Sequence, residues 1–470
     1  MTKVVILGGG PGGYEAALVG KQLGGEVTLI ERDGLGGAAV LTDCVPSKTL
    51  IATAEVMTTM RQAAELGLRL GPADAPEPVT GSVQVDLATV NRRVRELARA
   101  QSDDIRAKLT AEGVRVIAGS GRLDGTEAVI ASTADGQERL AADIILVATG
   151  TTPRELPTAR CDGERILNWK QVYHLSELPE RLIVVGSGVT GAEFASAYDA
   201  LGVEVVLVSS RDQVLPGQDH DAAAVLQEAF EERGMKVMSR SRAIAAERTG
   251  AGVRVLLEDG RTVEGSHCLM AVGAIPNTSG IGLEEAGVRL KASGHIVVDR
   301  VSRTSARGVY AAGDVTGVFA LASVAAMQGR IAMWHSLGDA VAPLDLRRVS
   351  SNVFTAPEIA TVGITQAQVD AGEVKAVQVL LPLSSNARAK MQGLRRGFVK
   401  LFCLPTTGII VGGVVVAPYA SELIHPISVA VAERITVDNF SQDFTVYPSL
   451  SGSIAEAARR LHNHSEFLTQ

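Results

Sequence analysis

The sequence is poor in cysteine and has no long apolar run. Its four cysteines, Cys44, Cys161, Cys268 and Cys403, lie far apart, without a C-x-x-C pair or the spacing of a metal site. This pattern excludes a disulfide scaffold and favours a reduced, cytoplasmic protein. No apolar stretch reaches the roughly 18 residues that a transmembrane helix needs. The apolar run in "MTKVVILGGGPGG" ends in glycines, so we interpret it as a strand and not as a signal peptide.

Positive charge is also lacking. The net charge of −7 argues against nucleic acid or an acidic membrane surface as the main partner. The composition, with 46% hydrophobic and 21% charged residues, is typical of a globular protein. A chain of 470 residues is too long for one core, so we expect roughly two to four domains.

A glycine pattern near the N-terminus predicts a dinucleotide-binding turn. "VVILGGGPGGYEAALVGKQLGGEVTLIER" follows the order strand, turn, helix, strand, with Gly8, Gly10 and Gly13 in the G-x-G-x-x-G spacing. The first glycine permits a tight turn, the second lets the backbone approach a pyrophosphate, and the third lets helix and strand pack closely. The helix N-terminus offers free N–H groups to phosphates. Glu31, which closes the second strand, can accept hydrogen bonds from a ribose.

The same pattern returns in "RLIVVGSGVTGAEFASAYDALGVEVVLVSSR". Gly186, Gly188 and Gly191 repeat the spacing, but Ser209 stands where the acidic residue would be. A carboxylate there would repel a 2′-phosphate, whereas serine does not, and Arg211 could pair with one. Arg211 could equally be a solvated surface residue. We therefore expect a nicotinamide dinucleotide here, with a weak preference for NADPH over NADH.

Further motifs carry a resemblance to a known family. "ADIILVATG" closes the first unit, "HCLMAVGAIPNT" closes the second, and "VYAAGDV" ends in Gly313 and Asp314. "APEIATVGIT" and "GFVKLFCLPTTGIIVGGVVVAPYASELI" follow. In this order the motifs resemble the flavoprotein disulfide reductase family of the dihydrolipoamide dehydrogenase type, over nearly the whole chain.

The resemblance implies an α/β fold with two Rossmann-like domains and a C-terminal α+β interface domain, through which the family forms homodimers. We expect an FAD domain at 1–155 and 277–343, an inserted NAD(P)H domain at 156–276 and an interface domain at 344–470. The expected FAD contacts are Gly8, Gly10, Pro11, Gly13, Glu31, Arg32, Gly37, Ala38, Lys48, Ala148, Thr149, Gly150, Gly313, Asp314, Leu321 and Ala322. The expected NAD(P)H contacts are Gly186, Gly188, Gly191, Glu193, Ser209, Arg211 and Gly273.

Two departures from the family pattern remove its thiol chemistry. The family segment G-G-x-C-x-x-x-x-C-x-P-S-K is matched at Cys44, but the first cysteine position is Ala39. Without that thiol no dithiol can open and close. The family's His-Pro-Thr-x-x-Glu stretch is here "YPSLSG", with Tyr447 at the histidine and Gly452 at the glutamate. Since a phenol is a poor general base at neutral pH, disulfide reduction is not expected.

By resemblance, Lys48 lies beside flavin N5 and pairs with Glu193, and a cation there favours the anionic reduced flavin. Cys44 has three interpretations: an inert packing thiol, which we favour, a thiolate in charge-transfer contact with the flavin, or a sulfenic acid cycle. The other three cysteines are expected to be buried. The family commonly has an arginine near the coenzyme at the position of Ala274, so that contact is absent here.

Three other stretches have plainer interpretations. His425-Pro426 could be mistaken for the missing histidine, but we interpret it as the start of an apolar helix. Residues 70–82 are expected to form a polar, Pro-rich loop, and "EAARRLHNHSEFLTQ" a frayed C-terminus.

The surviving machinery predicts hydride transfer from NAD(P)H to FAD and then directly to a diffusible acceptor. A quinone fits best, because it is planar and stacks on a flavin. The main hypothesis is an NAD(P)H:quinone oxidoreductase with a ping-pong cycle, in which the partner's Tyr447 lines the site. The alternatives are a soluble pyridine nucleotide transhydrogenase, whose family members carry a similar Tyr-Pro-Thr stretch, and a redox-sensing flavoprotein.

Overall fold

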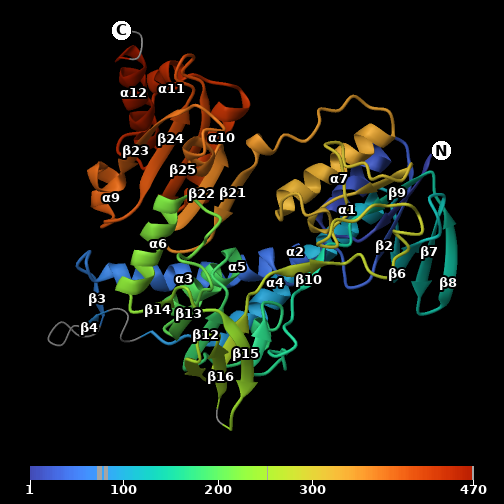
Figure 1. The fold of residues 1–470 in the computed structure, drawn as a ribbon, viewed down its shortest axis with the longest axis horizontal. Helices are drawn as coiled ribbons and strands as arrows, with labels where there is room; N and C mark the ends of the chain where they lie inside the picture. Colours follow the sequence, from blue (N-terminus) through green and yellow to red (C-terminus); the bar gives the residue numbers. More distant parts are fainter. Residues whose placement is uncertain (71–76, 79–82, 251, 468–470) are drawn as a thin grey trace.

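The computed structural model describes residues 1–70, 77–78, 83–250 and 252–467 and arranges them in three lobes (Figure 1). Each lobe is built on a five-stranded sheet, and we number the lobes first to third along the chain. Most of the loop expected at 70–82 lies outside the described residues. Within the described ranges, no helix combines the length and the apolar character required to cross a membrane.

The first lobe has a parallel sheet in the order β20-β9-β1-β2-β5. Val4 and Ile6 pack toward α1, α4 and α7, whereas Val5 and Leu7 pack toward the antiparallel sheet β6-β7-β8. Both faces are buried, which explains why β1 is apolar without alternation. The elements are β1 Lys3–Leu7, α1 Pro11–Gln22, β2 Glu26–Glu31, α2 Gly37–Leu41, α3 Cys44–Ala63, β3 Arg69–Leu70, β4 Glu77–Pro78, α4 Leu87–Ala111, β5 Arg115–Ala118, β6 Ser120–Leu123, β7 Ala128–Thr133, β8 Gly136–Ala141, β9 Ile144–Val147, β20 Val309–Ala311, η3 Asp314–Thr316 and α7 Ala322–Ser336.

The second lobe repeats this plan with the parallel sheet β11-β18-β12-β13-β14 and the antiparallel sheet β15-β16-β17. A short ribbon of β10 and β19 carries the chain into and out of this lobe. The elements are β10 Thr151–Pro153, β11 Ile166–Asn168, η2 Val172–His174, β12 Arg181–Val185, α5 Val189–Ala200, β13 Glu204–Val208, α6 His220–Glu232, β14 Lys236–Met238, β15 Ala243–Arg248, β16 Val253–Leu257, β17 Thr262–Gly265, β18 His267–Met270 and β19 Ala274–Pro276.

The third lobe has an antiparallel sheet in the order β21-β22-β25-β24-β23. Val415 and Ala417 face α10 and α12, whereas Val414 and Val416 face the second lobe. The elements are η4 Leu346–Arg348, β21 Ser350–Val353, β22 Glu358–Gly363, α8 Gln366–Asp370, β23 Val377–Pro382, η5 Leu383–Ser385, α9 Ala387–Met391, β24 Phe398–Cys403, β25 Ile410–Ala417, α10 Ala420–Ala432, α11 Val437–Gln442 and α12 Gly452–Phe467.

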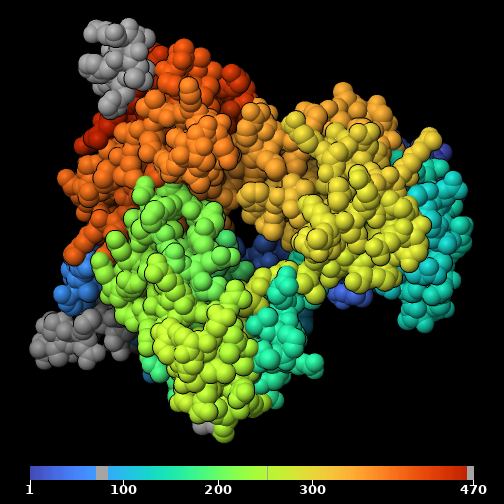
Figure 2. All heavy atoms as spheres, in the orientation of Figure 1, coloured from blue at the N-terminus to red at the C-terminus, as the bar shows by residue number. Residues whose placement is uncertain are grey.

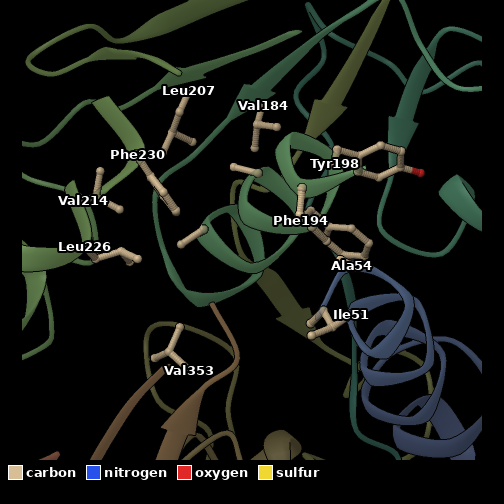
Figure 3. Packing of buried hydrophobic residues seen from close by; sticks show 14 of the residues in the cluster. Ile51, Ala54, Val184, Phe194, Tyr198, Leu207, Val214, Leu226, Phe230 and Val353 are labelled. Carbon is tan, nitrogen blue, oxygen red and sulfur yellow. The ribbon is translucent and has the colours of Figure 1, made fainter. Parts of the chain in front are cut away.

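One hydrophobic cluster joins all three lobes. Helix α3 extends from the first lobe past the second (Figure 1), and its Ile51 and Ala54 pack in the same cluster as Phe194 and Tyr198 of α5 and Val353 of β21 (Figure 3). The space-filling view shows a hollow where the lobes meet, with N-terminal atoms in blue at its base (Figure 2). The lobes are therefore packed around α3 and α5.

Two expectations near the C-terminus were wrong. Residues 456–467 of the segment expected to be frayed belong to α12, which begins at Gly452 and buries side chains such as Ile454 and Leu461 at helical spacing, and residues 468–470 lie outside the described residues. Strand β25 ends at Ala417 and α10 begins at Ala420, so His425 and Pro426 lie inside the helix and not at its start.

Candidate active site

The first glycine turn joins β1 to α1 through close backbone contacts. Gly8 has a φ of +101°, and a Cβ on it would lie 2.3 Å from the carbonyl oxygen of Ala148. A Cβ on Gly13 would lie 1.8 Å from the carbonyl oxygen of Gly8, so only glycine permits this approach. Gly10, by contrast, has no atom closer than 4.0 Å to the place of its missing Cβ. The turn thus leaves room for a phosphate at the N-terminus of α1, which begins at Pro11.

Glu31 and the Gly36–Gly37 turn lie beside this space. The Glu31 carboxylate accepts hydrogen bonds from the N–H groups of Gly9 and Asp33, both at 2.6 Å. The Gly36 N–H donates to the Gly9 carbonyl at 2.8 Å, which holds the two turns together. Arg32 is exposed and pairs with Asp33. Glu31 therefore organises the loop on which a ribose would rest.

The end of β9 is tied to the chain that returns from the second lobe. The Thr149 hydroxyl donates to the Asn277 carbonyl at 2.8 Å, and the Asn277 amide donates to the Thr149 carbonyl at 2.8 Å. The Asn277 N–H also donates to the carbonyl of Gly150, whose φ is +65°. These reciprocal hydrogen bonds fix the Ala148–Gly150 turn, whose residues the sequence analysis predicts to contact FAD.

Asp314 and the start of α7 lie at the end of β20. The Gly313 N–H donates to the Gln328 side chain at 2.8 Å, so α7 holds the turn that precedes Asp314. Burial raises the pKa of Asp314 above its usual range. Leu321 is the N-cap of α7 and Ala322 its first residue, and α7 packs directly on α1. The N-termini of α1 and α7 thus lie in the same lobe, on two helices that pack against each other.

Helices α2 and α3 carry the altered cysteine segment. Ala38 and Ala39 lie in α2, and Cys44 begins α3 one turn before Lys48. All four cysteines are free thiols. Burial raises the pKa of Cys44 to about 12, with Asp43 adding to the rise, so the thiol is protonated at neutral pH. Among the remaining cysteines, Cys268 and Cys403 are buried as expected, but Cys161 is only half-buried.

Lys48 forms an ion pair across two lobes. Its Nζ lies 2.8 Å from Glu193 Oε2 on α5, as the resemblance predicted. The Glu193 side chain is 5% exposed and the Lys48 side chain 31% exposed. Burial acts to lower the pKa of Lys48, but the charge and the hydrogen bond of Glu193 outweigh it and the pKa is raised. Lys48 is therefore a fixed ammonium at neutral pH.

The second glycine turn joins β12 to α5 and repeats the geometry of the first. A Cβ on Gly186 would lie 2.2 Å from the Ala271 carbonyl oxygen, and one on Gly191 would lie 1.8 Å from the Gly186 carbonyl oxygen. Gly188 has no atom within 4 Å of its missing Cβ, and neither has Gly273. This turn too leaves room for a pyrophosphate at a helix N-terminus.

At the end of β13, the Ser209 hydroxyl is engaged within the protein, whereas the Arg211 cation is not paired with any acid of the described residues. Ser209 is fully buried, and its hydroxyl lies 2.7 Å from that of Ser187 and accepts from the Arg211 N–H at 3.1 Å. Arg211 is exposed and has no acidic partner among the described residues, whereas the neighbouring Arg240 pairs with Asp212. Ser209 shapes the turn, and the unpaired charge is that of Arg211.

Tyr447 lies apart from these groups. Its side chain is 85% exposed, in the segment between α11 and α12 of the third lobe. Phe444 and Val446 in the same segment are also exposed. Within one chain, the structure therefore does not bring Tyr447 together with Lys48.

Two residues of the site were missed by sequence reasoning. Phe354 follows β21, and its N–H donates to Glu193 Oε1 at 3.0 Å while its ring lies under Lys48 Nζ, 4.8 Å from ring centroid to nitrogen. Asp43 precedes α3, and burial raises its pKa to about 6. Asp43 could have been noticed as the acid beside Cys44. No local signal marks Phe354, because its partners are far away in the sequence.

The residues present fit two dinucleotides. Each glycine turn combines an open space above Gly10 or Gly188 with a helix N-terminus whose N–H groups point out of the turn. The Lys48 ammonium stands between the two lobes that carry these turns. The donor set is thus suited to two pyrophosphates and one anionic group between them.

Comparisons with known proteins agree with this geometry. Residues 2–329 match the family model described as pyridine nucleotide-disulphide oxidoreductase, and residues 349–458 match its dimerisation domain. The chain is 56% identical to an NAD(P)H dehydrogenase (quinone) of Mycobacterium tuberculosis, over 99% of this chain and 95% of the relative. It is 33% identical to dihydrolipoyl dehydrogenase 2 of Haloarcula marismortui, over 97% and 96%.

Solved structures give the same result. The crystal structure of LpdA from Mycobacterium tuberculosis matches with a TM-score of 0.92 and 56% identity, over 98% of this chain and 100% of that one. The flavoprotein disulfide reductase RclA from Escherichia coli, at 22% identity, shares the fold with a TM-score of 0.84 over 98% and 99%. This chain belongs to the pyridine nucleotide-disulphide oxidoreductase family, which uses FAD and NAD(P)H, and it carries the family's dimerisation domain.

Proposed function

We propose that this protein is an FAD-dependent NAD(P)H:quinone oxidoreductase without disulfide reductase activity. The observation that carries the proposal is the single thiol at the reactive helix: Cys44 is a free, half-buried, protonated thiol, and Ala39 occupies the place of its partner. Electrons that enter the site have no disulfide to reduce. The relative with 56% identity is named an NAD(P)H dehydrogenase (quinone), which supports the same function.

The two glycine turns divide the cofactors between the lobes. We assign FAD to the turn at Gly8–Gly13, with Glu31, the Ala148–Gly150 turn and Asp314, in a domain of residues 1–155 and 277–343. We assign NAD(P)H to the turn at Gly186–Gly191, with Arg211, in a domain of residues 156–276, and the interface domain to 344–470. The open helix N-termini at both turns support this division.

Lys48 is the cation that we assign to the flavin, and Glu193 holds it in place through an ion pair. Bound FAD supplies a ring that accepts a hydride from NAD(P)H and passes two electrons to an acceptor. An ammonium fixed beside that ring stabilises the negative charge that develops on reduction, and it is already oriented before the reaction. Glu193 keeps Lys48 protonated, so this charge persists at neutral pH and above.

The functional unit we propose is a homodimer. The dimerisation domain and the exposed apolar segment around Tyr447 support it. In the dimer, the partner subunit's Tyr447 would line the acceptor site. A quinone could then stack on the flavin in a pocket that both subunits form.

An anaerobic titration of the holoenzyme tests the function. NADH or NADPH should reduce the flavin, and full reduction should take two electrons per FAD. Reduced enzyme should then be reoxidised by quinones, but not by lipoamide or glutathione disulfide. Four electrons per FAD, or rapid turnover of a disulfide with quinones inert, would contradict the proposal.

Two other outcomes have distinct signatures. Rapid transfer from NADPH to a thio-NAD analogue, with little quinone turnover, would make the protein a transhydrogenase, for which the Tyr447-Pro448-Ser449 stretch is the supporting feature. Failure of both coenzymes to reduce the flavin would indicate a redox-sensing flavoprotein instead.

A further inference from the structure

Phe354 makes two contacts with the Lys48–Glu193 pair, one from its backbone and one from its ring. Its N–H donates to Glu193 Oε1 at 3.0 Å, while Lys48 binds the other carboxylate oxygen, Oε2, at 2.8 Å. The Lys48 ammonium also lies 4.8 Å from the centroid of the Phe354 ring, within the range of a cation–π contact. Both carboxylate oxygens are therefore engaged, and the ammonium has an anion on one side and a ring on another.

The loop that carries Phe354 is anchored independently of this pair. One turn further along α5, the Ser196 hydroxyl accepts from the Ala356 N–H at 3.0 Å. The Arg233 guanidinium donates to the Ala356 carbonyl at 2.7 Å, and the same guanidinium pairs with Asp199 of α5 at 3.0 Å. Val353, just before Phe354, is buried in the cluster shared by the three lobes (Figure 3). The position of the Phe354 backbone is thus fixed by contacts that do not involve Lys48.

We propose that Phe354 is a positioning residue that fixes the Lys48 ammonium at the flavin, so that the third lobe controls the charge beside the redox centre. This inference rests on the proposed function, which places Lys48 next to the flavin ring. The lysine ammonium stands on a flexible four-carbon stem, and a single ion pair with Glu193 does not by itself fix every rotatable bond of that stem. The Phe354 ring adds a second contact to the same ammonium, so rotamers that move it off the ring lose the cation–π contact.

The experiment compares F354L, which removes the ring and keeps the backbone N–H, with F354Y, which keeps both. Holoenzymes are reduced anaerobically by NAD(P)H in a stopped-flow instrument, and the flavin midpoint potential is measured separately. For F354L we expect flavin reduction to slow by about 3- to 10-fold, the fold-change that loss of a half-exposed cation–π contact gives. The potential should become more negative, because the reduced anionic flavin loses stabilisation. F354Y should match the wild type.

A double-mutant cycle separates this role from a packing role. In a K48M background, F354L should have no further effect on rate or potential, since the group it positions is absent. F354M serves as a second ring-free variant that preserves more volume. The matched control is F398L, because the Phe398 ring lies 5.7 Å from the ammonium of Lys400, another buried cation–π contact, within β24 and away from Lys48. F398L should leave the flavin potential unchanged.

The outcomes distinguish this inference from the function on which it rests. If K48M shifts the potential and F354L and F354M do not, Phe354 is not a positioning residue, whereas the assignment of Lys48 stands. The inference also fails if the F354L effect persists in K48M or if F398L reproduces it. If K48M itself changes neither rate nor potential, the proposed role of Lys48 fails, and the inference fails with it. None of these readouts depends on which acceptor reoxidises the flavin.

Discussion

Lys48 and Cys44 lie one helical turn apart on α3, yet their protonation favours opposite roles. Glu193 holds Lys48 as an ammonium, whereas burial raises the pKa of Cys44 to about 12. At neutral pH the site therefore contains a fixed cation and a neutral sulfur. A protonated thiol is a weak nucleophile and donor, so the structure favours the packing interpretation of Cys44 over a thiolate or sulfenic acid cycle.

Alkylation should show the protonation state of Cys44 directly. With a pKa of about 12, the thiolate fraction at about pH 8 is roughly a thousandfold below that of an ordinary cysteine. Cys44 of the folded holoenzyme should therefore resist iodoacetamide at about pH 8, and its labelling should accelerate only as the pH rises toward the pKa. Peptide mass spectrometry gives the rate for each cysteine, and urea-unfolded protein, in which all four should react normally, is the control. Fast labelling of folded Cys44 would contradict this assignment.

Arg211 should determine coenzyme preference. Its guanidinium is exposed and unpaired among the described residues, at the turn where a 2′-phosphate would lie. R211A should lower kcat/KM for NADPH by about 10-fold or more, because a charge-assisted hydrogen bond is lost, and leave NADH nearly unchanged. R240A is the matched control, since Arg240 lies beside the same turn but pairs with Asp212. An equal loss for both coenzymes in R211A would show that Arg211 does not contact a 2′-phosphate.

Among the elements, α5 does most to join the site together. Its N-terminus carries the second glycine turn, and Glu193, Ser196 and Asp199 follow at intervals of three residues. These three side chains bind Lys48, the loop after β21, and two arginines of other segments. Three buried polar side chains of α5 thus connect the three lobes.

The sequence predicted the local parts of this arrangement and missed the distant ones. Both glycine turns follow from spacing alone, because each turn is made by neighbouring residues. The Lys48–Glu193 pair was predicted only through the family resemblance. Phe354 was not predicted, since its contact with Glu193 spans 161 residues and nothing in the local pattern encodes it. The many polar residues of "EAARRLHNHSEF" hid α12, whose apolar face becomes evident only against β23 and β24.

A buried ion cluster between α6 and β24 should contribute strongly to stability. Lys400 Nζ lies 2.8 Å from Asp219 and 2.7 Å from Asp221, and the Lys400 side chain is 1% exposed. K400M should lower the free energy of unfolding by about 3 kcal/mol, because it leaves the buried Asp219 carboxylate uncompensated. D221N should cost no more than about 1 kcal/mol, because Asp221 is half-exposed. Urea unfolding of the holoenzyme measures both.

The control for this cluster is an exposed ion pair between lobes. Arg395 and Glu65 lie 3.4 Å apart, with the Arg395 side chain 81% exposed. R395M should change the free energy of unfolding by less than about 1 kcal/mol, because solvent screens the pair. Similar decreases in the free energy of unfolding for K400M and R395M would mean that the buried cluster stabilises the protein no more than an exposed ion pair does.

At the scale of the whole molecule, the shared cluster makes the three lobes one packed body. Side chains of α3, α5 and β21 are buried together, so the lobes do not meet only through polar linkers (Figure 3). Interfaces between domains that move freely are usually smaller and more polar. We therefore expect the Lys48–Glu193–Phe354 arrangement to persist through turnover.

The segment between α11 and α12 carries apolar side chains that are strongly exposed in one chain. Phe444 is fully exposed and Val446 is 77% exposed. If the partner subunit buries both side chains, replacing them by serine in F444S/V446S should weaken the dimer roughly a hundredfold or more in Kd, since each buried apolar side chain contributes about 1.5–3 kcal/mol. Sedimentation velocity over a dilution series measures the shift. Under the proposed function, in which the partner's Tyr447 lines the acceptor site, activity should fall with the dimer fraction. I244S, at an exposed apolar residue of β15 in the second lobe, is the control and should leave the association unchanged. A variant that stays dimeric at nanomolar concentration would place the interface elsewhere.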